Sequence, residues 1–198
     1  MDSSAWDERY AASELVWSAG PNQFVERELA ELEPGRALDL ACGEGRNARW
    51  LAARGWQVTA MDFSPVAIEK ARNLHDAVDW QVGDALTAEL PGHLDLVVIA
   101  YLQIVPEERA TVLRRAFASL RTGGRFLVVA HDSTNLSEGT GGPQDPAVLF
   151  TAEDVTADLA DARFVVVHAE RVARAVSSPA EPGCTRTAWD ALVHLVRS

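Results

Sequence analysis

The sequence predicts an α/β protein with a doubly wound, mostly parallel seven-stranded sheet and a C-terminal antiparallel hairpin. Three observations support this class. Over the first two thirds of the chain, short apolar segments alternate with segments of helical period. The first apolar segment runs into a Gly-x-Gly turn at Gly43 and Gly45, a common strand-to-helix connection in such sheets. The last two apolar segments follow one another with no helical segment between them.

The first five strands are expected at residues 36–40, 57–61, 78–82, 94–100 and 125–130, with helices near 47–54, 65–74 and 106–120. Two of these helices begin with a proline, at Pro65 and Pro106, which is favoured at the first helical position. In the last helix an apolar stripe at steps of three and four should face the sheet: Ala110, Leu113, Phe117 and Leu120.

The alternation changes after the fifth strand. Thr151-x-x-Asp154 predicts a capped short helix, and strands at 164–172 and 187–196 should pair as a hairpin at the sheet edge. The segment 131–146 is rich in Gly, Ser, Thr, Asp and Pro and follows the C-terminal end of a strand. Loops at that position carry substrate contacts in open α/β sheets, although a disordered surface insertion is the alternative.

A chain of 198 residues is ordinary for one domain. We expect an N-terminal helical cap over residues 1–32, a cofactor-binding core over 36–130, a substrate loop over 131–150, and a helix and hairpin over 151–198. The net charge of -11 disfavours a nucleic-acid partner. The chain begins without a secretion signal, and its longest apolar run, 96–102, is too short to cross a bilayer. A cytoplasmic protein with no membrane partner, monomeric or homodimeric, is therefore expected.

The cysteines and histidines do not predict a metal site. Cys42 and Cys184 are far apart and belong to no Cys-x-x-Cys pattern, so neither a disulfide framework nor a zinc site is expected. Four histidines have no ligand-like spacing to one another and read as surface or edge residues: His75, His93, His168 and His194.

The glycine turn and a later acid predict a nucleoside-cofactor site. Gly43 and Gly45 let the backbone approach a ligand, and amides at the following helix start face it. Asp62 lies 19 residues after Gly43 at the end of the next strand, where an acid accepts ribose hydroxyl protons. Gly43-x-Gly45-x-x-Ala48 also fits the looser dinucleotide fingerprint, which leaves an NAD-dependent oxidoreductase as an alternative. That alternative lacks a Tyr-x-x-x-Lys pair, since Lys70 is the only lysine.

The turn Leu38-Asp39-Leu40-Ala41-Cys42-Gly43-Glu44-Gly45 resembles that of class I S-adenosylmethionine-dependent methyltransferases. The segments 43–48 and 62–64 look most like the small branch that contains the tellurite-resistance methyltransferases. The opening Trp6-Asp7-Glu8-Arg9-Tyr10 looks like the N-terminal segment that folds over the cofactor in that branch.

This resemblance implies S-adenosylmethionine as the cofactor and a role for each matching residue. The methionine part would lie against the 39–45 turn and Ala100, Asp62 would hold the ribose, Phe63 would flank the adenine, and Asp84 would bind its amino group. Ala41 stands where many relatives carry glycine. The full set of expected cofactor residues is Tyr10, Asp39, Ala41, Gly43, Gly45, Arg46, Asn47, Asp62, Phe63, Asp84, Ala85, Ala100 and Tyr101.

The expected reaction is methyl transfer to a small-molecule acceptor by in-line displacement. Tyr101 and Gln103 after the fourth strand and the His131-Asp132 pair after the fifth should surround the methyl group. His131 is the candidate base or acceptor-orienting residue because of its strand-end position and its acidic neighbour. A non-catalytic cofactor-binding module remains the third hypothesis. The acceptor itself is not predicted.

Overall fold

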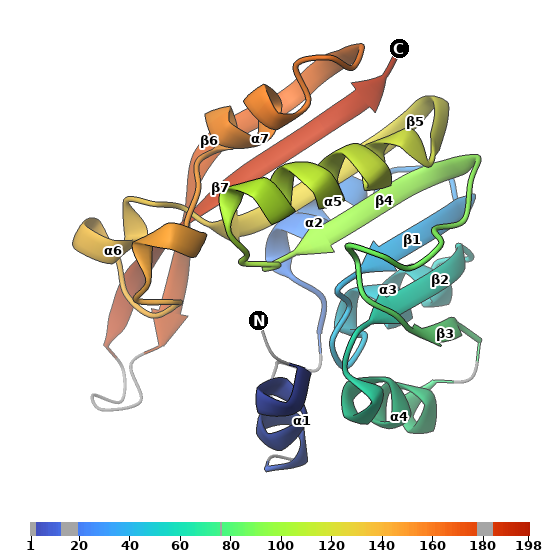
Figure 1. Ribbon diagram of the computed structural model, residues 1–198, viewed down its shortest axis with the longest axis horizontal. Helices are drawn as coiled ribbons and strands as arrows, with labels where there is room; N and C mark the ends of the chain where they lie inside the picture. Colours follow the sequence, from blue (N-terminus) through green and yellow to red (C-terminus); the bar gives the residue numbers. More distant parts are fainter. Residues whose placement is uncertain (1–2, 13–19, 76, 178–183) are drawn as a thin grey trace.

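The computed structural model describes residues 3–12, 20–75, 77–177 and 184–198. Seven strands form one sheet in the order β3-β2-β1-β4-β5-β7-β6 (Figure 1). The first five are parallel, and β7 runs antiparallel between β5 and β6. The expected class, with its parallel sheet and terminal hairpin, is confirmed. The strands are β1 (Arg36–Leu40), β2 (Gln57–Asp62), β3 (Asp79–Val82), β4 (Leu94–Ala100), β5 (Leu120–His131), β6 (Phe164–Ser177) and β7 (Thr185–Arg197).

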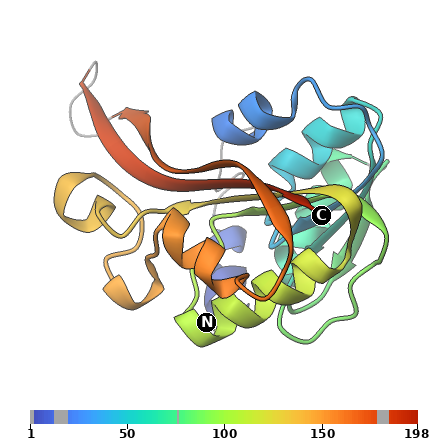
Figure 2. The same cartoon turned by 90° about the horizontal axis from the view of Figure 1, so that it is seen from above.

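Helices cover both faces of the sheet, as the view from above shows (Figure 2). The helices are α1 (Ser3–Ala11), α2 (Gln23–Leu29), α3 (Arg46–Ala53), α4 (Pro65–Leu74), α5 (Pro106–Ala118), α6 (Asn135–Glu138), the 3-10 turn η1 (Pro146–Val148) and α7 (Ala152–Asp158). In β4, Leu96 and Val98 pack with α2, α3 and α4, whereas Val97 and Ile99 pack with α5 and α7. This period-2 alternation buries both faces of the strand.

Local sequence accounts for where several helices begin. Ser64 caps α4, its Oγ accepting a 3.1 Å hydrogen bond from the amide of Ala67. Thr151 and Asp154 form the expected capping box at the start of α7. The expected helix 106–120 was too long at its end, because Leu120 already belongs to β5. Its side chain still packs in the core shared with α5.

The terminal hairpin is longer than the sequence predicted. Strands expected at 164–172 and 187–196 run over 164–177 and 185–197. Residues 173–177 of β6 pair with 185–189 of β7, a stretch of β7 that has no ladder partner in β5, and the hairpin projects beyond the rest of the sheet (Figure 1). Cross-strand hydrogen bonds of this kind have no local sequence signal.

The segment after β5, expected as a loop, contains α6 and has internal anchors. Asn135 is buried, and its Oδ1 accepts the amide proton of Trp189 at 2.8 Å. Its Nδ2 donates to the carbonyl oxygen of Gly141 at 2.9 Å. These two bonds hold the segment against β7, next to the carboxyl end of the sheet.

The N-terminal region divides into two parts with different roles. Helix α1 packs on α4, while α2 buries Phe24, Val25 and Leu29 against the sheet and so belongs to the core. Residues 1–2 and 13–19 of the expected cap, and 178–183 of the hairpin, lie outside the described residues. Among the helices of the described segments, none combines the length and the apolar character needed to span a bilayer.

Candidate active site

A cavity of about 920 Å³ opens at the carboxyl ends of β1, β2 and β4. The glycine turn forms its floor, α1 and the segments after β3 and β4 form its sides, and the 140–143 segment and β6 close the far end. All the expected site residues line it except Asp39 and Gly45: Tyr10, Ala41, Gly43, Arg46, Asn47, Asp62, Phe63, Asp84, Ala85, Ala100, Tyr101 and His131.

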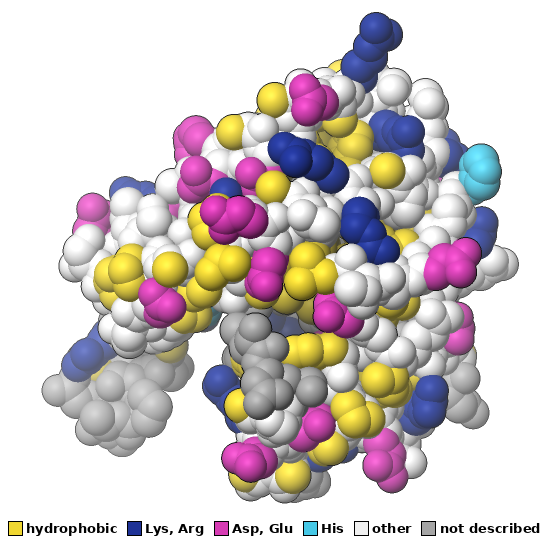
Figure 3. All heavy atoms as spheres, in the orientation of Figure 1, with side chains coloured by type: hydrophobic (Ala, Val, Ile, Leu, Met, Phe, Trp, Pro, Cys, Tyr) yellow, Lys and Arg dark blue, Asp and Glu magenta, His cyan; other side chains and the backbone are white. Residues whose placement is uncertain are grey.

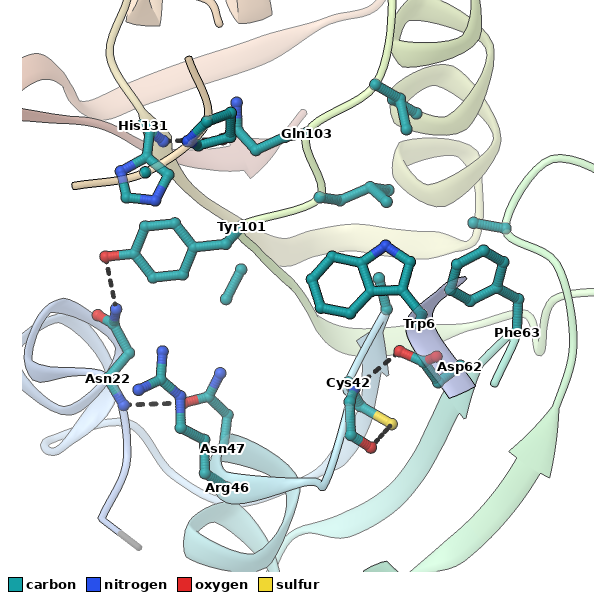
Figure 4. Close-up of a pocket in the computed structure, with 18 of the residues that line it drawn as sticks. Trp6, Asn22, Cys42, Arg46, Asn47, Asp62, Phe63, Tyr101, Gln103 and His131 are labelled. Carbon is teal, nitrogen blue, oxygen red and sulfur yellow. Dashed lines mark hydrogen bonds between the residues drawn. The ribbon is translucent and has the colours of Figure 1, made fainter. Parts of the chain in front are cut away.

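One end of the cavity is acidic and aromatic. Asp62 ends β2, and Trp6 from α1 lies beside Phe63 (Figure 4). Each carboxylate oxygen of Asp62 accepts a backbone amide, Gly43 N at 2.8 Å and Ser64 N at 2.9 Å. Burial raises the pKa of Asp62, and these amide bonds act against that rise. Asp84 is exposed at the same end, with Oδ1 accepting from Leu86 N at 2.8 Å.

The two glycines of the turn have different roles. Gly43 lines the cavity with φ at 55°, as expected for close backbone approach. Gly45 caps α3 with φ at 74°, and a Cβ there would lie 2.1 Å from the ring of Trp80. Gly45 therefore serves the packing of the turn on β3. Ala41 also lies in the left-handed region, with φ at 59°.

Asp39 lies near the end of β1 and is buried. Its Oδ2 accepts from Ala48 N at 3.0 Å, while its Oδ1 is buried with no hydrogen-bond partner. Burial raises the pKa of Asp39 to about 7. A buried carboxylate oxygen without a hydrogen-bond partner is rare in folded proteins.

The other end of the cavity is built around Asp190, a fully buried residue on β7. Tyr101 donates its hydroxyl proton to Asp190 Oδ2 at 2.9 Å, and Arg174 Nε donates to the same oxygen at 2.6 Å. Asn22 Nδ2 donates to the Tyr101 hydroxyl at 3.2 Å. Burial opposes ionisation of Asp190, but His131, Arg174 and Tyr101 hold its pKa below the ordinary value. Tyr101 itself has φ at 62°, a strained conformation of the kind found at functional sites.

His131 ends β5, and its ring lies against that of Tyr101, with centroids 4.7 Å apart (Figure 4). Its Nδ1 is 3.3 Å from Asp190 Oδ1, an ion-pair distance without hydrogen-bond alignment. The expectation that Asp132 is the partner of His131 was wrong. The Asp132 carboxylate instead accepts from the amide and hydroxyl of Thr134 at 2.9 and 2.7 Å. Successive strand residues point to opposite faces, which separates His131 from its neighbour.

Sequence reasoning missed Asp190, Arg174 and Asn22. Asp190 is an acid within an apolar segment, and such a residue is a signal for a buried polar role. The register that places it opposite His131 comes from the fold. Arg174 lies on the part of β6 that the sequence did not predict as strand.

The fold and the site together resemble those of class I S-adenosylmethionine-dependent methyltransferases. Residues 37–124 match the family model described as a methyltransferase domain, and this segment runs from β1 past β4 and includes the glycine turn. Both findings favour this class over the oxidoreductase alternative.

Relatives with known names agree with this class. A ubiquinone biosynthesis O-methyltransferase from Xanthomonas euvesicatoria pv. vesicatoria is 36% identical over 114 residues, which cover 54% of this chain and 46% of that protein. The chain thus spans about half the length of the curated relatives it matches.

Solved structures share the fold at low identity. The N-methyltransferase NodS from Bradyrhizobium japonicum WM9, in complex with S-adenosyl-L-homocysteine, superposes with a TM-score of 0.73 at 20% identity, covering 100% of this chain and 99% of that one. TehB from Haemophilus influenzae superposes with a TM-score of 0.72 at 18% identity, covering 90% and 63%.

Proposed function

We propose that this protein transfers the methyl group of S-adenosylmethionine to a small acceptor that carries negative charge. One observation carries the proposal. A single cavity joins an acidic, aromatic end at Asp62, Phe63 and Asp84 to a basic end at Arg46, Arg174 and His131.

The residues of the first end fit the cofactor. Asp62 can accept ribose hydroxyl protons with lone pairs not used by the Gly43 and Ser64 amides. Phe63 and Trp6 offer faces for the adenine, and Asp84 offers a carboxylate for its amino group. A cofactor with positive charge suits a site with aromatic faces and carboxylates. The unpartnered Oδ1 of Asp39 provides an acceptor near the methionine part.

The protein's contribution to the reaction is alignment and exclusion of water. When bound, S-adenosylmethionine supplies a methyl group already activated on a sulfonium. Tyr101 is fixed by Asn22 and Asp190 from two sides, so it forms a rigid wall beside the acceptor. Positioning of this kind supplies roughly 7 to 11 kcal/mol of the barrier without a covalent step.

His131 is suited to hold a proton from the acceptor. Its Nδ1 faces the carboxylate of Asp190, which favours the tautomer that carries the proton on Nδ1. The Nε2 atom is then the acceptor, and it can remove a proton from an acceptor hydroxyl or thiol. Asp190 would then stabilise the charged ring, a positioning role.

The sign of the acceptor's charge follows from the distribution of charge in the cavity. Arg46 and Arg174 lie 6.0 and 5.6 Å from the Tyr101 ring, measured from the guanidinium carbon to the centroid. Burial lowers the pKa of Arg46, and so does Arg174 nearby, so an anion between them would relieve both costs. On the face shown in Figure 3, acidic and basic side chains are interspersed.

The test compares acceptors that differ only in charge. The enzyme is incubated with S-adenosylmethionine and small hydroxy and thiol compounds, each supplied as a carboxylic acid and as its amide, and S-adenosylhomocysteine is quantified. We expect turnover with acids to exceed turnover with amides by at least about 10-fold, the value of one charge-assisted hydrogen bond. The Arg174→Gln variant should lose that preference. Equal rates for both series, or a preference for amides, would overturn the anionic acceptor.

A further inference from the structure

Three side chains from distant parts of the chain meet on the α2 side of the terminal hairpin. Glu28 of α2 places Oε2 2.7 Å from Nδ1 of His168 and 3.0 Å from Nδ1 of His194. All three atoms lie within 4.8 Å of one another. Glu28 and His194 are buried, with side chains 4% and 3% exposed, while the His168 side chain is 44% exposed.

An irregularity in the hairpin brings the two imidazoles together. Val166 pairs with Leu195, but the next pair is His168 with His194, so Val167 is an extra residue in β6. Without it, Val167 would stand opposite His194, and His168 would occupy the next position along. Such a bulge re-aims the side chains that follow it and is frequent beside functional sites. The two histidines are 26 positions apart in the sequence, which explains why sequence spacing gave no sign of the pairing.

We propose that Glu28, His168 and His194 bind a borderline divalent metal ion, Zn²⁺ in particular. Two imidazole nitrogens and one carboxylate oxygen form a ligand set used for zinc, and nitrogen ligands disfavour Mg²⁺ and Ca²⁺. Bonds of about 2.0 to 2.2 Å in a tetrahedral site place ligand atoms about 3.3 Å apart. The two histidine nitrogens, now 2.7 and 3.0 Å from Oε2, would each move outward from it by about 0.3 to 0.6 Å. The two nitrogens lie within 4.8 Å of each other and would come to about the same 3.3 Å separation. The exposed side of His168 leaves the remaining position to water.

Arg125 opposes the metal in the arrangement observed. Its Nη1 lies 3.2 Å from Nε2 of His194. A guanidinium donates there, which keeps the His194 proton on Nδ1. Metal ligation through Nδ1 moves that proton to Nε2 and requires the Arg125 side chain, which is partly exposed, to turn away. Removal of Arg125 should therefore strengthen metal binding, a result that a simple hydrogen-bonded clasp does not predict.

Metal binding would connect α2 to the hairpin. Asn22 caps the start of α2 and contacts Tyr101 in the cavity, while Glu28 lies near the other end of the same helix. The hairpin places Arg174 on the cavity wall, and the buried Asp190 behind it holds the Arg174 guanidinium. The ion would thus join α2 to the hairpin, and both of these elements contribute to the acceptor end of the cavity. The metal site would lie about the length of α2 from that end. The proposal itself does not depend on the methyltransferase activity.

The experiment is a calorimetric titration of the tag-free full-length protein with ZnCl₂, repeated with CoCl₂ under visible absorption. Five proteins are compared: wild type, His168→Ala, Glu28→Gln, Arg125→Gln and the control His75→Ala, all carrying Cys184→Ser to remove an exposed thiol ligand. His168 is exposed enough for its variant to fold, and thermal unfolding of each protein verifies this.

We expect one zinc ion per chain in the wild type and in His75→Ala, with a rise in Tm. Loss of a residue that only orients a ligand costs about 10- to 100-fold in affinity, so His168→Ala and Glu28→Gln should lose at least that much. Arg125→Gln should bind more tightly than the wild type, and the cobalt spectrum should vanish in His168→Ala. Wild-type binding that His168→Ala leaves unchanged, or no saturable binding in the wild type, overturns the proposal.

Discussion

Ala41 lines the cavity in a strained backbone conformation. Its φ of 59° is a left-handed conformation that costs an L-residue about 1–2 kcal/mol, while glycine in the unfolded chain costs about 0.5–1 kcal/mol of entropy. We therefore expect Ala41→Gly to raise the free energy of unfolding by up to about 1 kcal/mol, measured by urea denaturation. Ala52→Gly, within α3, is the control and should lower the free energy of unfolding by about 1 kcal/mol. A loss of stability in Ala41→Gly similar to that of Ala52→Gly would contradict this account of the turn.

Asp39 makes the stability of the ligand-free protein depend on pH. Its pKa is about 7 in the folded protein and about 3.9 in an unfolded chain. Between these values the folded state keeps a proton that the unfolded state has released, so this contribution is full below pH 4 and is lost as pH rises through 7. Relative to Asp39→Asn, the free energy of unfolding of the wild type should fall by on the order of 4 kcal/mol between pH 4 and pH 8, measured by urea denaturation at each pH. Parallel pH profiles of the two proteins would contradict burial as the cause.

The individual site residues were predictable where they directly follow a strand that the sequence pattern located. Gly43, Asp62 and Phe63 follow strands that the apolar pattern located, so their meeting at the sheet end was expected. Asp190 and Arg174 reach the cavity through the register of β7 with β5 and β6, which is a long-range property. The choice of Asp132 as the partner of His131 failed for the same reason, since adjacency in sequence is not adjacency in a strand.

At the scale of elements, α1 is held over the cavity by the only lysine of the chain. Lys70 on α4 donates to the carbonyl oxygen of Tyr10, near the end of α1, and lies 3.3 Å from Glu44 Oε1 in the glycine turn. The hydroxyl of Ser64 donates to Asp7 nearby. Because Trp6 and Tyr10 line the cavity, Lys70 couples the cap to the turn beneath it.

Loss of this coupling should weaken cofactor binding more than it weakens the fold. One hydrogen bond to a charged group contributes about 1.5 kcal/mol, so we expect Lys70→Gln to raise the Kd for S-adenosylhomocysteine about 10-fold. In Lys70→Gln, hydrogen exchange at the α1 amides should accelerate relative to the wild type more than exchange at the α4 amides does. Glu69→Gln, a neighbouring exposed position on α4, is the control. Wild-type affinity in Lys70→Gln would show that α1 docks without this contact.

The elements themselves were largely predicted, and their extents were not. Apolar runs and proline starts located β1 to β5 and α3 to α5, because each of these elements buries a periodic face. The hairpin beyond Val172 was missed because its strands pair only with each other, so burial leaves little periodic pattern there. The bulge at Val167 is likewise a product of pairing, and with it the meeting of His168 and His194.

At the scale of the whole molecule, a strongly acidic protein contains a cavity with a basic end. The net charge of -11 would repel an anionic acceptor at long range, although salt screens this repulsion beyond about 10 Å. Arg46 and Arg174 act at short range, inside a partly closed space where screening is weak. The carboxyl ends of the parallel strands form the acidic end of the cavity, and β6 and β7 supply Arg174 and Asp190 at the other end.

The measurement that tests the central claim most directly is calorimetric titration with S-adenosylhomocysteine and, separately, with NAD. The wild type should bind the first in the micromolar range and show no heat with the second. Phe63→Ala should lose about 1–3 kcal/mol of binding, the value of one base stacked on an aromatic ring, while Val165→Ala, exposed on the hairpin, should bind as the wild type does. Phe63 is preferable to Asp62 for this purpose, because both oxygens of Asp62 hold backbone amides. Binding of NAD in place of S-adenosylhomocysteine, or equal affinity in Phe63→Ala and the wild type, would contradict the account.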